Sequence, residues 1–311
     1  MRRSTLADNG SFYKGNLHTH STISDGRLSP EKMVEQYKSL GYDFLSLTDH
    51  EIYGTHEERT TEDFLMVPGT EIAVDATVGG SFWRCHHLLA IGGPDNRYAH
   101  GHQFDRDRNN GVPVQQLVDE IRAQGNLVIY NHPHWSRVEL NQFDMLDGLN
   151  GMEIFNYGCA VENRTGNSED YYYGLLLRHK NMWCYGTDDA HCRLNDVGGG
   201  YIVAKAASLT LPDIYTALES GSFYACNAET GKDAPHIEKF YWEDGVAHLE
   251  CSPCKRVQIV ADTDYFSEQD LENCSLTGGE LKVPATAYCV RAMCESAEGF
   301  LSWSQPIFLQ D

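Results

Sequence analysis

The sequence predicts an α/β protein with a mainly parallel sheet, open or closed into a barrel, followed by a small antiparallel β domain. Three observations support this prediction. Strand-like and helix-like segments alternate through residues 1–232. Clusters of His, Asp and Glu follow the strand-like segments, and residues 233–311 contain short strand-like segments with few helices between them.

The first strand–helix–strand unit has clear signals at its boundaries. Residues 15–20 form a short strand candidate that ends in polar side chains. Ser29 and Pro30 are typical of a helix start, since serine accepts a hydrogen bond from the first turn and proline suits the first helical position. Gly41 is typical of a helix end, and residues 42–48 form the next strand candidate.

The same alternation continues along the chain. We expect further strands at 65–68, 87–92, 126–130, 151–155 and 182–186, and helices at 113–124, 169–180 and 211–220. Residues 95–111 are polar and aperiodic, so we expect a long loop there that borders the site. Functional residues gather at the carboxyl ends of parallel strands, so the polar clusters after these strands are expected to share one site.

Residues 233–311 follow a different pattern. Six short strand candidates lie at 237–242, 246–251, 256–261, 279–283, 287–294 and 300–308. Strands at this spacing indicate a small β-sandwich-like domain. We therefore divide the chain into residues 1–232, which hold the catalytic chemistry, and residues 233–311, which are expected to add no metal ligand.

The composition excludes some classes of partner. The formal net charge of −21 argues against binding duplex nucleic acid through a basic surface. A small anionic substrate stays compatible with this charge, because bound metal ions can reverse the local field. No segment approaches the roughly 20 apolar residues that span a membrane, and no apolar core follows the two N-terminal arginines, so neither a membrane protein nor a secretory signal is expected.

The ten cysteines are scattered through the chain. This pattern suits reduced thiols, and it favours a cytoplasmic location over a disulfide framework. Cys251-Ser-Pro-Cys254 is a single CxxC motif with no second pair at zinc-ribbon spacing. On the sequence alone, structural zinc there is the less favoured interpretation.

Twelve of the fourteen histidines lie at or before position 191. His18 and His20 are two residues apart, so a strand would place both imidazoles on one face. An isolated pair of this kind is more often two partly exposed histidines. Here Asp25 follows within a Ser-Asp-Gly turn, and a nearby carboxylate makes metal binding the better interpretation.

The chain resembles the PHP (polymerase and histidinol phosphatase) family over roughly residues 14–225. Four motifs occur in the order that this family has. They are the His-x-His segment with its Ser-Asp-Gly turn, Thr-Asp-His at 48–50, Asn-His-Pro at 131–133 and Asp-x-His at 189–191. The resemblance implies a distorted (β/α)7-type barrel.

The resemblance also implies two ligands between the second and third motifs. Glu71 stands in Gly-Thr-Glu-Ile, and His87 opens an apolar strand. His86 is the alternative to His87, but strand alternation sends it to the opposite face. The implied metal ligands are His18, His20, Asp25, His50, Glu71, His87, His132, Asp189 and His191. Nine N and O ligands suit about three ions, of Zn, Mn or Fe, that share Glu71.

Several other residues are candidates with two interpretations each. His134 is expected either to donate a proton to the leaving group or to lie at the rim of the site. Arg84 and Arg137 are substrate-phosphate candidates, although an exposed arginine is usually only solvated. Asp49 and Asp188 each neighbour a ligand and are expected to orient a ligand histidine.

The expected activity is hydrolysis of phosphate mono- or diesters, with a metal-bridging hydroxide as nucleophile at a trinuclear site. Three divalent ions, three ligand carboxylates and one hydroxide leave the centre at about +2, which favours a small anionic substrate. Hydrolysis of a carbamate, amide or carboxylic ester is the alternative, because residues 217–225 and 300–308 resemble the carbaryl-hydrolase-like branch of the family. A non-enzymatic binding module is the third possibility.

Overall fold

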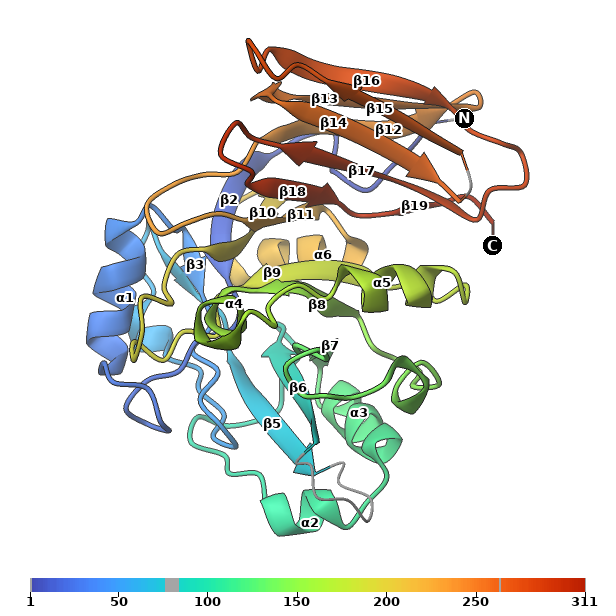
Figure 1. Cartoon of the computed structure of the whole chain (residues 1–311). Coiled ribbons are helices and arrows are strands. Elements are labelled where there is room, and N and C mark those ends of the chain that lie inside the picture. The colour runs from blue at the N-terminus through green and yellow to red at the C-terminus, as the bar shows by residue number, and fades with distance from the viewer. Residues whose placement is uncertain (1, 76–83, 263, 311) are drawn as a thin grey trace.

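The computed structural model describes residues 2–75, 84–262 and 264–310. Within these ranges the strands form an α/β structure with three sheets (Figure 1). The largest sheet runs through both halves of the chain. Its order is β15 (Asp264–Gln269), β14 (Arg256–Ala261), β17 (Cys289–Glu295), β18 (Leu301–Ser304), β11 (Phe223–Asn227), β10 (Gly200–Ala206), β2 (Ser11–Asn16), β3 (Phe44–Leu45) and β4 (Leu65–Met66), and β19 (Ile307–Phe308) pairs with β17.

The second sheet carries much of the candidate site. Its order is β5 (Gly69–Asp75), β6 (Cys85–Gly92), β7 (Asn126–Tyr130), β8 (Gly151–Asn156) and β9 (Trp183–Thr187). The pairs β7–β8 and β8–β9 are parallel, whereas β5–β6 and β6–β7 are antiparallel. Nearly every residue of these strands is buried, as expected for a sheet covered on both faces.

The described residues do not form the closed (β/α)7 barrel that the resemblance implies. The first and second sheets meet at one side only through isolated bridges, of His50 with Glu71 and of Gly54 with Gly69. At the other side β9 packs against β10 and β11. The alternation of strand and helix also fails between β5 and β6, because antiparallel neighbours need no helical crossover.

The helices agree closely with the sequence signals. The helices are α1 (Pro30–Ser39), α2 (Arg106–Asn110), α3 (Val114–Ala123), α4 (Tyr157–Asn163), α5 (Glu169–Leu176) and α6 (Leu211–Ser220), with short 3-10 turns at Glu57–Arg59 and Leu140–Gln142. Ser29 caps α1 by accepting from the Lys32 backbone N–H. The expected loop at 95–111 contains α2, and α4, β1, β10, β11 and β15 were not anticipated. No helix in the described ranges is long and apolar enough to cross a membrane.

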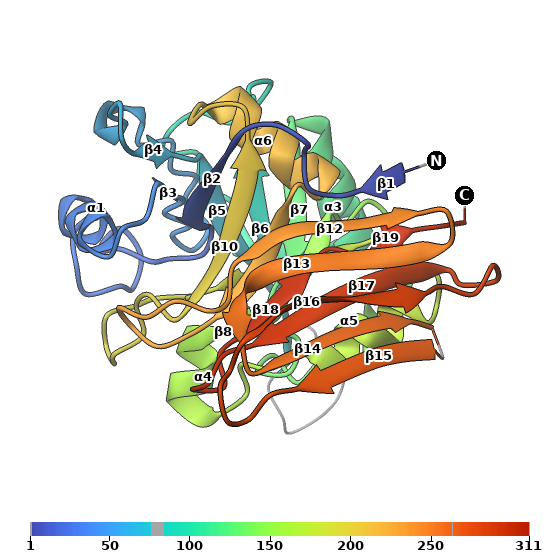
Figure 2. The ribbon, with the colours of Figure 1, turned by 90° about the horizontal axis from the view of Figure 1, so that it is seen from above.

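The C-terminal strands form two packed layers above the rest of the molecule (Figures 1 and 2). One layer is the sheet β1 (Arg2–Ser4), β12 (Ile237–Glu243), β13 (Val246–Cys254) and β16 (Leu276–Lys282). The other is the β14–β15–β17 end of the largest sheet. Phe240, Leu249, Val257 and Ile259 are buried in the shared core, which is the packing of a β-sandwich.

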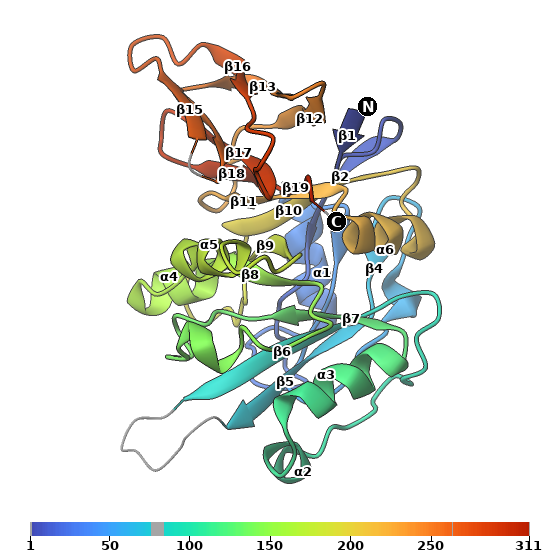
Figure 3. The same cartoon turned by 90° about the vertical axis from the view of Figure 1, so that its right-hand side faces the viewer.

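Strand pairing crosses the predicted 232/233 domain boundary twice. The N-terminal strand β1 pairs with β12, and β11 pairs with β18. Figure 3 shows the two chain ends near this same region. The division into residues 1–232 and 233–311 stays a prediction, but the two parts share backbone hydrogen bonds as well as side-chain contacts.

Gln305 connects the two parts through a buried amide. Its Nε2 donates to the Cys184 carbonyl and its Oε1 accepts from the Cys184 backbone N–H, both at 2.8 Å. The side chain is completely buried. It therefore acts as a substitute strand partner for β9, since Cys184 is the second residue of that strand.

We predict that Gln305→Ala lowers the free energy of unfolding by about 2 kcal/mol or more, because it leaves two buried backbone groups without a partner. Chemical denaturation followed by tryptophan fluorescence measures the change. Gln310→Ala is the matched control, since Gln310 is exposed and also donates to backbone carbonyls. Equal small losses for both variants would contradict this role for Gln305.

Candidate metal centre

The predicted ligands come from segments that meet at one edge of the strands. His18 and His20 follow β2, His50 follows β3, His132 follows β7, and Asp189 follows β9. His87 lies near the start of β6, which is antiparallel to its neighbours, so the start of β6 reaches the same edge. This arrangement follows from parallel strand ends sharing one edge of a sheet.

Backbone hydrogen bonds hold these segments in register. The Asp189 N–H donates to His18 O at 2.8 Å, and the His20 N–H donates to Ala190 O at 2.9 Å. In the same way Thr48 N–H donates to Thr19 O, and Glu71 N–H donates to Thr48 O. The first, second and fourth motifs and Glu71 are therefore fixed to one another by the main chain.

Glu71 is the common neighbour of five predicted ligands. Its carboxylate oxygens lie 2.8–3.3 Å from ring nitrogens, and the side chain is only 1% exposed. The histidines in contact are His18, His20, His50, His87 and His132. Asn131 Nδ2 also donates to Glu71 at 2.9 Å. This position agrees with a carboxylate that is shared between ions.

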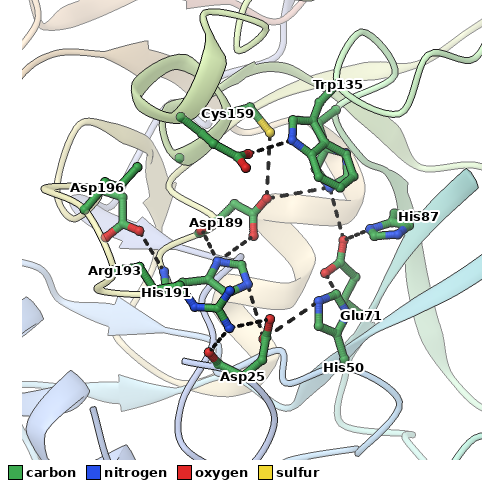
Figure 4. A pocket seen from close by; sticks show the side chains of 14 residues that line it. Asp25, His50, Glu71, His87, Trp135, Cys159, Asp189, His191, Arg193 and Asp196 are labelled. Carbon is green, nitrogen blue, oxygen red and sulfur yellow. Dashed lines mark hydrogen bonds and ion pairs between the residues drawn. The ribbon is translucent and has the colours of Figure 1, made fainter. Parts of the chain in front are cut away.

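Asp189 and Asp25 gather the remaining ligands. Asp189 lies 3.0 Å from His20 and 3.2 Å from His18. Asp25 lies 3.2 Å from His191 Nε2 and 3.9 Å from His50 Nε2. All nine predicted side chains thus meet in one place, and Figure 4 shows six of those that line the cavity: Asp25, His50, Glu71, His87, Asp189 and His191.

The nine side chains form three overlapping groups of potential ligand atoms, each within 4.8 Å of one another. The groups are His18, His20, Glu71 and Asp189; then Glu71, His87 and His132; and then His20, Asp25, His50 and His191. Glu71 belongs to two groups and so does His20. Glu153, which is not one of the nine, forms a further group with His18 and His132. The N and O donor atoms of these groups suit divalent transition metals.

The buried carboxylates of the site need positive charge beside them. Burial by itself opposes protonation of His20, but Asp189 and Glu71 outweigh it and raise the pKa of His20 to about 10. The pKa of His18 is likewise raised against burial by Asp189, Glu71 and Glu153. Without cations, protons on these imidazoles compensate the buried carboxylates, and metal ions would replace those protons.

Two buried ring nitrogens also fit a metal. Among the described residues, His18 Nε2 and His20 Nδ1 make no hydrogen bond, although both are inaccessible to solvent. Carboxylate oxygens lie near both atoms, with Glu71 and Asp189 each 3.2 Å from His18 Nε2 and Asp25 3.9 Å from His20 Nδ1. A metal ion between them would supply the missing interaction. Asp189 and His132 adopt left-handed backbone conformations, with φ of 52° and 24°, which is the kind of strain that concentrates at functional sites.

Glu153 is a functional residue that the sequence analysis missed. Its Oε1 accepts from His18 Nδ1 at 2.7 Å and from Thr187 Oγ1 at 2.6 Å. Its Oε2 accepts from the His132 backbone N–H and from Asn156 Nδ2. It therefore fixes the His18 tautomer that presents Nε2 to the site. The available signal was a carboxylate in the otherwise apolar strand 151–155.

The expected roles of Asp188 and Asp49 were wrong. Asp188 contacts no histidine; it accepts from the backbone N–H groups of residues 198–200 and from Tyr37 Oη. Asp49 accepts from the backbone N–H and hydroxyl groups of Ser21 and Ser24. Both carboxylates hold loops that lead to ligands, so they position the ligands through the main chain.

His87 and His86 point to opposite faces of β6, as strand alternation requires. His87 Nδ1 lies 2.8 Å from Glu71, and His87 lines the cavity. His86 Nδ1 lies 2.6 Å from Tyr130 Oη instead. The structure therefore places His87, rather than His86, among the candidate ligands.

Three predicted site residues do not reach the cavity. His134 is exposed, and its Nδ1 lies 3.2 Å from the carbonyl oxygen of Asn167. Arg84 lies 3.7 Å from Glu139, and Arg137 is exposed on a neighbouring turn. None of the three is among the residues that line the cavity. Their positions give no support to proton donation or to phosphate binding.

A cavity of about 220 Å³ opens over the ligand cluster. Its lining also includes side chains that the sequence analysis did not assign to the site. Trp135, Cys159, Arg193 and Asp196 are labelled in Figure 4, and Glu162 and Leu194 belong to the same lining. The Arg193 guanidinium lies 3.1 Å from Asp25 Oδ2 and is half exposed to the cavity mouth. Arg193 is thus a cation next to a candidate ligand, where Arg84 and Arg137 were expected.

No protein-family model matches this chain, and no curated protein matches it. Several solved structures are similar to it, and three of them are described below. One is a two-domain protein from Bacteroides vulgatus described as containing a predicted PHP-like metal-dependent phosphoesterase; it is 18% identical over 99% of this chain and 90% of that chain, with a TM-score of 0.49.

The second is a protein from Bifidobacterium adolescentis described as a metal-dependent phosphoesterase, 18% identical over 57% of this chain and 87% of its own, with a TM-score of 0.40. The third is an amidohydrolase from Chromobacterium violaceum with bound sulfate and no metal, 16% identical over 67% and 96%, with a TM-score of 0.44. At these identities and TM-scores the three matches carry no argument about this chain.

We predict that Glu153→Gln weakens metal binding about 10- to 100-fold, because an amide cannot accept all four hydrogen bonds that orient His18 and the His132 segment. Competition with a chromophoric chelator measures the affinity. Glu162→Gln is the matched control, since Glu162 lies on the cavity wall and bonds to Trp135 Nε1. Unchanged affinity in Glu153→Gln would mean that His18 is oriented by other contacts.

Proposed function

We propose that the chain is a metal-dependent hydrolase of the PHP type that cleaves phosphate mono- or diesters at a centre of about three ions. The observation that carries this proposal is the convergence of nine His, Asp and Glu side chains in three overlapping groups beneath one cavity. Such a density of buried ligand atoms, with two ring nitrogens lacking partners, has a simple explanation in metal binding.

In this proposal each of the three groups would hold one ion. Glu71 would be shared between the group that contains His18 and the group that contains His132. His191 and Asp25 would serve the third group. When bound, divalent Zn, Mn or Fe supplies a water of lowered pKa and polarises a phosphoryl oxygen. The protein keeps the ligand imidazoles in place through Glu153 and through the main-chain bonds between motifs.

The charge of the site favours a phosphate over a neutral group. Three divalent ions would balance the six carboxylates in and beside the cavity, which are Asp25, Glu71, Glu153, Glu162, Asp189 and Asp196. Arg193 adds a guanidinium at the cavity mouth, with donors suited to phosphate oxygens. The acidic remainder of the protein makes this local positive field the attractive feature for a small anion.

The apolar part of the cavity wall would hold the leaving group. Trp135 and Leu194 line the cavity, and Leu194 is 52% exposed. A ring or short hydrocarbon of an ester could cover these side chains and limit access of bulk water to the reacting bond. The volume of the cavity, about 220 Å³, suits a small substrate.

We predict that phosphate-ester hydrolysis disappears after treatment with a chelator and returns with Mn, Zn or Fe. Initial rates on a panel of phosphate monoesters and diesters, aryl esters and carbamates would measure this. Clear turnover of a carbamate or carboxylic ester, with no turnover of any phosphate ester by fully metallated protein, would assign the function to the alternative hydrolase activity.

Two variants accompany this experiment. Asp189→Asn should lower kcat by about 100-fold or more, because it removes a charged ligand that is close to His18, His20 and His132. His134→Ala should change the rate little, since His134 does not line the cavity. If His134 were the general acid, its loss would cost about 10²- to 10⁴-fold with poor leaving groups, and that result would restore the role expected from the sequence.

A second prediction concerns substrate charge. Arg193→Gln should raise KM for phosphate esters by about tenfold, the equivalent of losing about 1.4 kcal/mol of binding, while a neutral aryl ester should be affected far less. Arg137→Gln is the matched control, because Arg137 is exposed and outside the cavity. Equal effects of Arg193→Gln on charged and neutral substrates would assign Arg193 to holding Asp25 instead.

A further inference from the structure

Three cysteines form a second cluster of potential ligands, far along the sequence from the candidate metal centre. Cys251 and Cys254 lie in β13, and Cys294 lies in β17. Their sulfur atoms all lie within 4.8 Å of one another. The three side chains are 6%, 1% and 0% exposed, in that order. All ten cysteines of the chain lie in the described ranges, and none is in a disulfide.

The backbone creates this cluster by an irregularity in β13. A regular strand would point residues three apart to opposite faces. The pairing of β13 with β16 shifts register between Glu250 and Cys254, and this irregularity lets both sulfur atoms face the same core. Cys251 Sγ and Cys254 Sγ are 3.8 Å apart as a result.

This separation fits one shared metal ion. Thiolate bonds to zinc are about 2.3 Å long, and a tetrahedral arrangement then places two sulfur atoms about 3.8 Å apart. Cys294 supplies the third sulfur from the opposite sheet of the sandwich. The carbonyl oxygens of Arg256 and Leu276 lie 3.3 and 3.4 Å from Cys254 Sγ. Either oxygen could serve as the fourth ligand of a tetrahedral ion.

Neighbouring side chains supply some positive charge. Lys255 and Arg256 follow Cys254 directly, and both pair with Glu295, which follows Cys294. The two cations and one carboxylate leave this trio at +1. Three thiolates with one divalent ion carry −1, so the local charges would balance.

We propose that Cys251, Cys254 and Cys294 form a structural binding site for a thiophilic metal ion such as Zn²⁺. On binding, up to three S–H bonds break, three metal–sulfur bonds form and the protons pass to solvent, with no change of oxidation state. The ion ties β13 to β17, and so joins the two sheets of the C-terminal sandwich much as a disulfide would. This site is separate from the proposed hydrolase centre and does not depend on it.

The test uses Co²⁺ as a spectroscopic substitute for zinc in the full-length, metal-stripped and reduced protein. Thiolate ligation to Co²⁺ gives an intense near-ultraviolet charge-transfer band, which imidazole and carboxylate ligands do not give. We expect this band in the wild type. It should be lost in Cys251→Ser and in Cys294→Ala, and Zn²⁺ should displace it.

Two control variants separate this site from other thiols. Cys159→Ser removes the thiol that lies 3.9 Å from Asp189 at the candidate metal centre. Cys274→Ser removes a half-buried thiol outside the cluster. Both should keep the band. They exclude these two thiols as the source of the band. If Cys251→Ser or Cys294→Ala fails to fold, Zn²⁺ protection of Cys251, Cys254 and Cys294 from alkylation in the wild type, mapped by peptide mass spectrometry, decides the question.

Three results would overturn the proposal. The first is the absence of the band from reduced wild-type protein. The second is its loss in Cys159→Ser or Cys274→Ser, which would place the thiolate ligand elsewhere. The third is a Cys251–Cys254 disulfide, found by peptide mass spectrometry of protein purified without reductant, in molecules that bind no cobalt after reduction.

Discussion

The structure depends first on the burial of several carboxylates among imidazoles. Glu71 is 1% exposed and contacts five histidines, and Glu153 is completely buried beside His18. Burial alone would raise the pKa of Glu71, yet His18, His87 and His50 hold it well below its usual range. Such a concentration of charge is stable only if each group has an opposite neighbour at short distance. The rest of the fold serves to keep those neighbours in place.

The main chain around the site holds these charged side chains close together in several ways. Motif segments are hydrogen-bonded to one another, so a ligand cannot shift without breaking a strand-like contact. Asp188 and Asp49 fix the loops that lead to Asp189 and Asp25. Gly158 lies so close to the Asp188 and Asp189 carbonyls that a Cβ would come within 2.8 Å of either oxygen. The ligand geometry is therefore a property of packed backbone rather than of flexible side chains.

The C-terminal strands extend this rigidity. They continue the largest sheet through β18 and β17, cover β9 through Gln305, and recruit the N-terminal strand β1 into their own sheet. The proposed thiolate site would add a cross-link at the point where β13 turns into β14. The sandwich supplies no member of the main ligand cluster among the described residues. Its contribution to the site is support for β9, which leads to Asp189.

The sequence by itself determined the local features of this protein. The capped helix at 30–39 and most strand positions follow from spacing and alternation, which are short-range properties, as do the opposite faces of His86 and His87. The set of nine polar side chains came instead from the resemblance of four local motifs to the PHP family. The tertiary structure alone decided the features that join distant segments. Glu153 sits in an apolar strand, Arg193 replaces Arg84 and Arg137 at the cavity, and Cys294 joins a CxxC motif 40 residues away. The tertiary structure also decided that β5, β6 and β7 run antiparallel and that the sheets stay open and do not close into a barrel. The physical reason is that these contacts depend on sheet order and register, which are fixed by packing over the whole chain and leave no local pattern in the sequence.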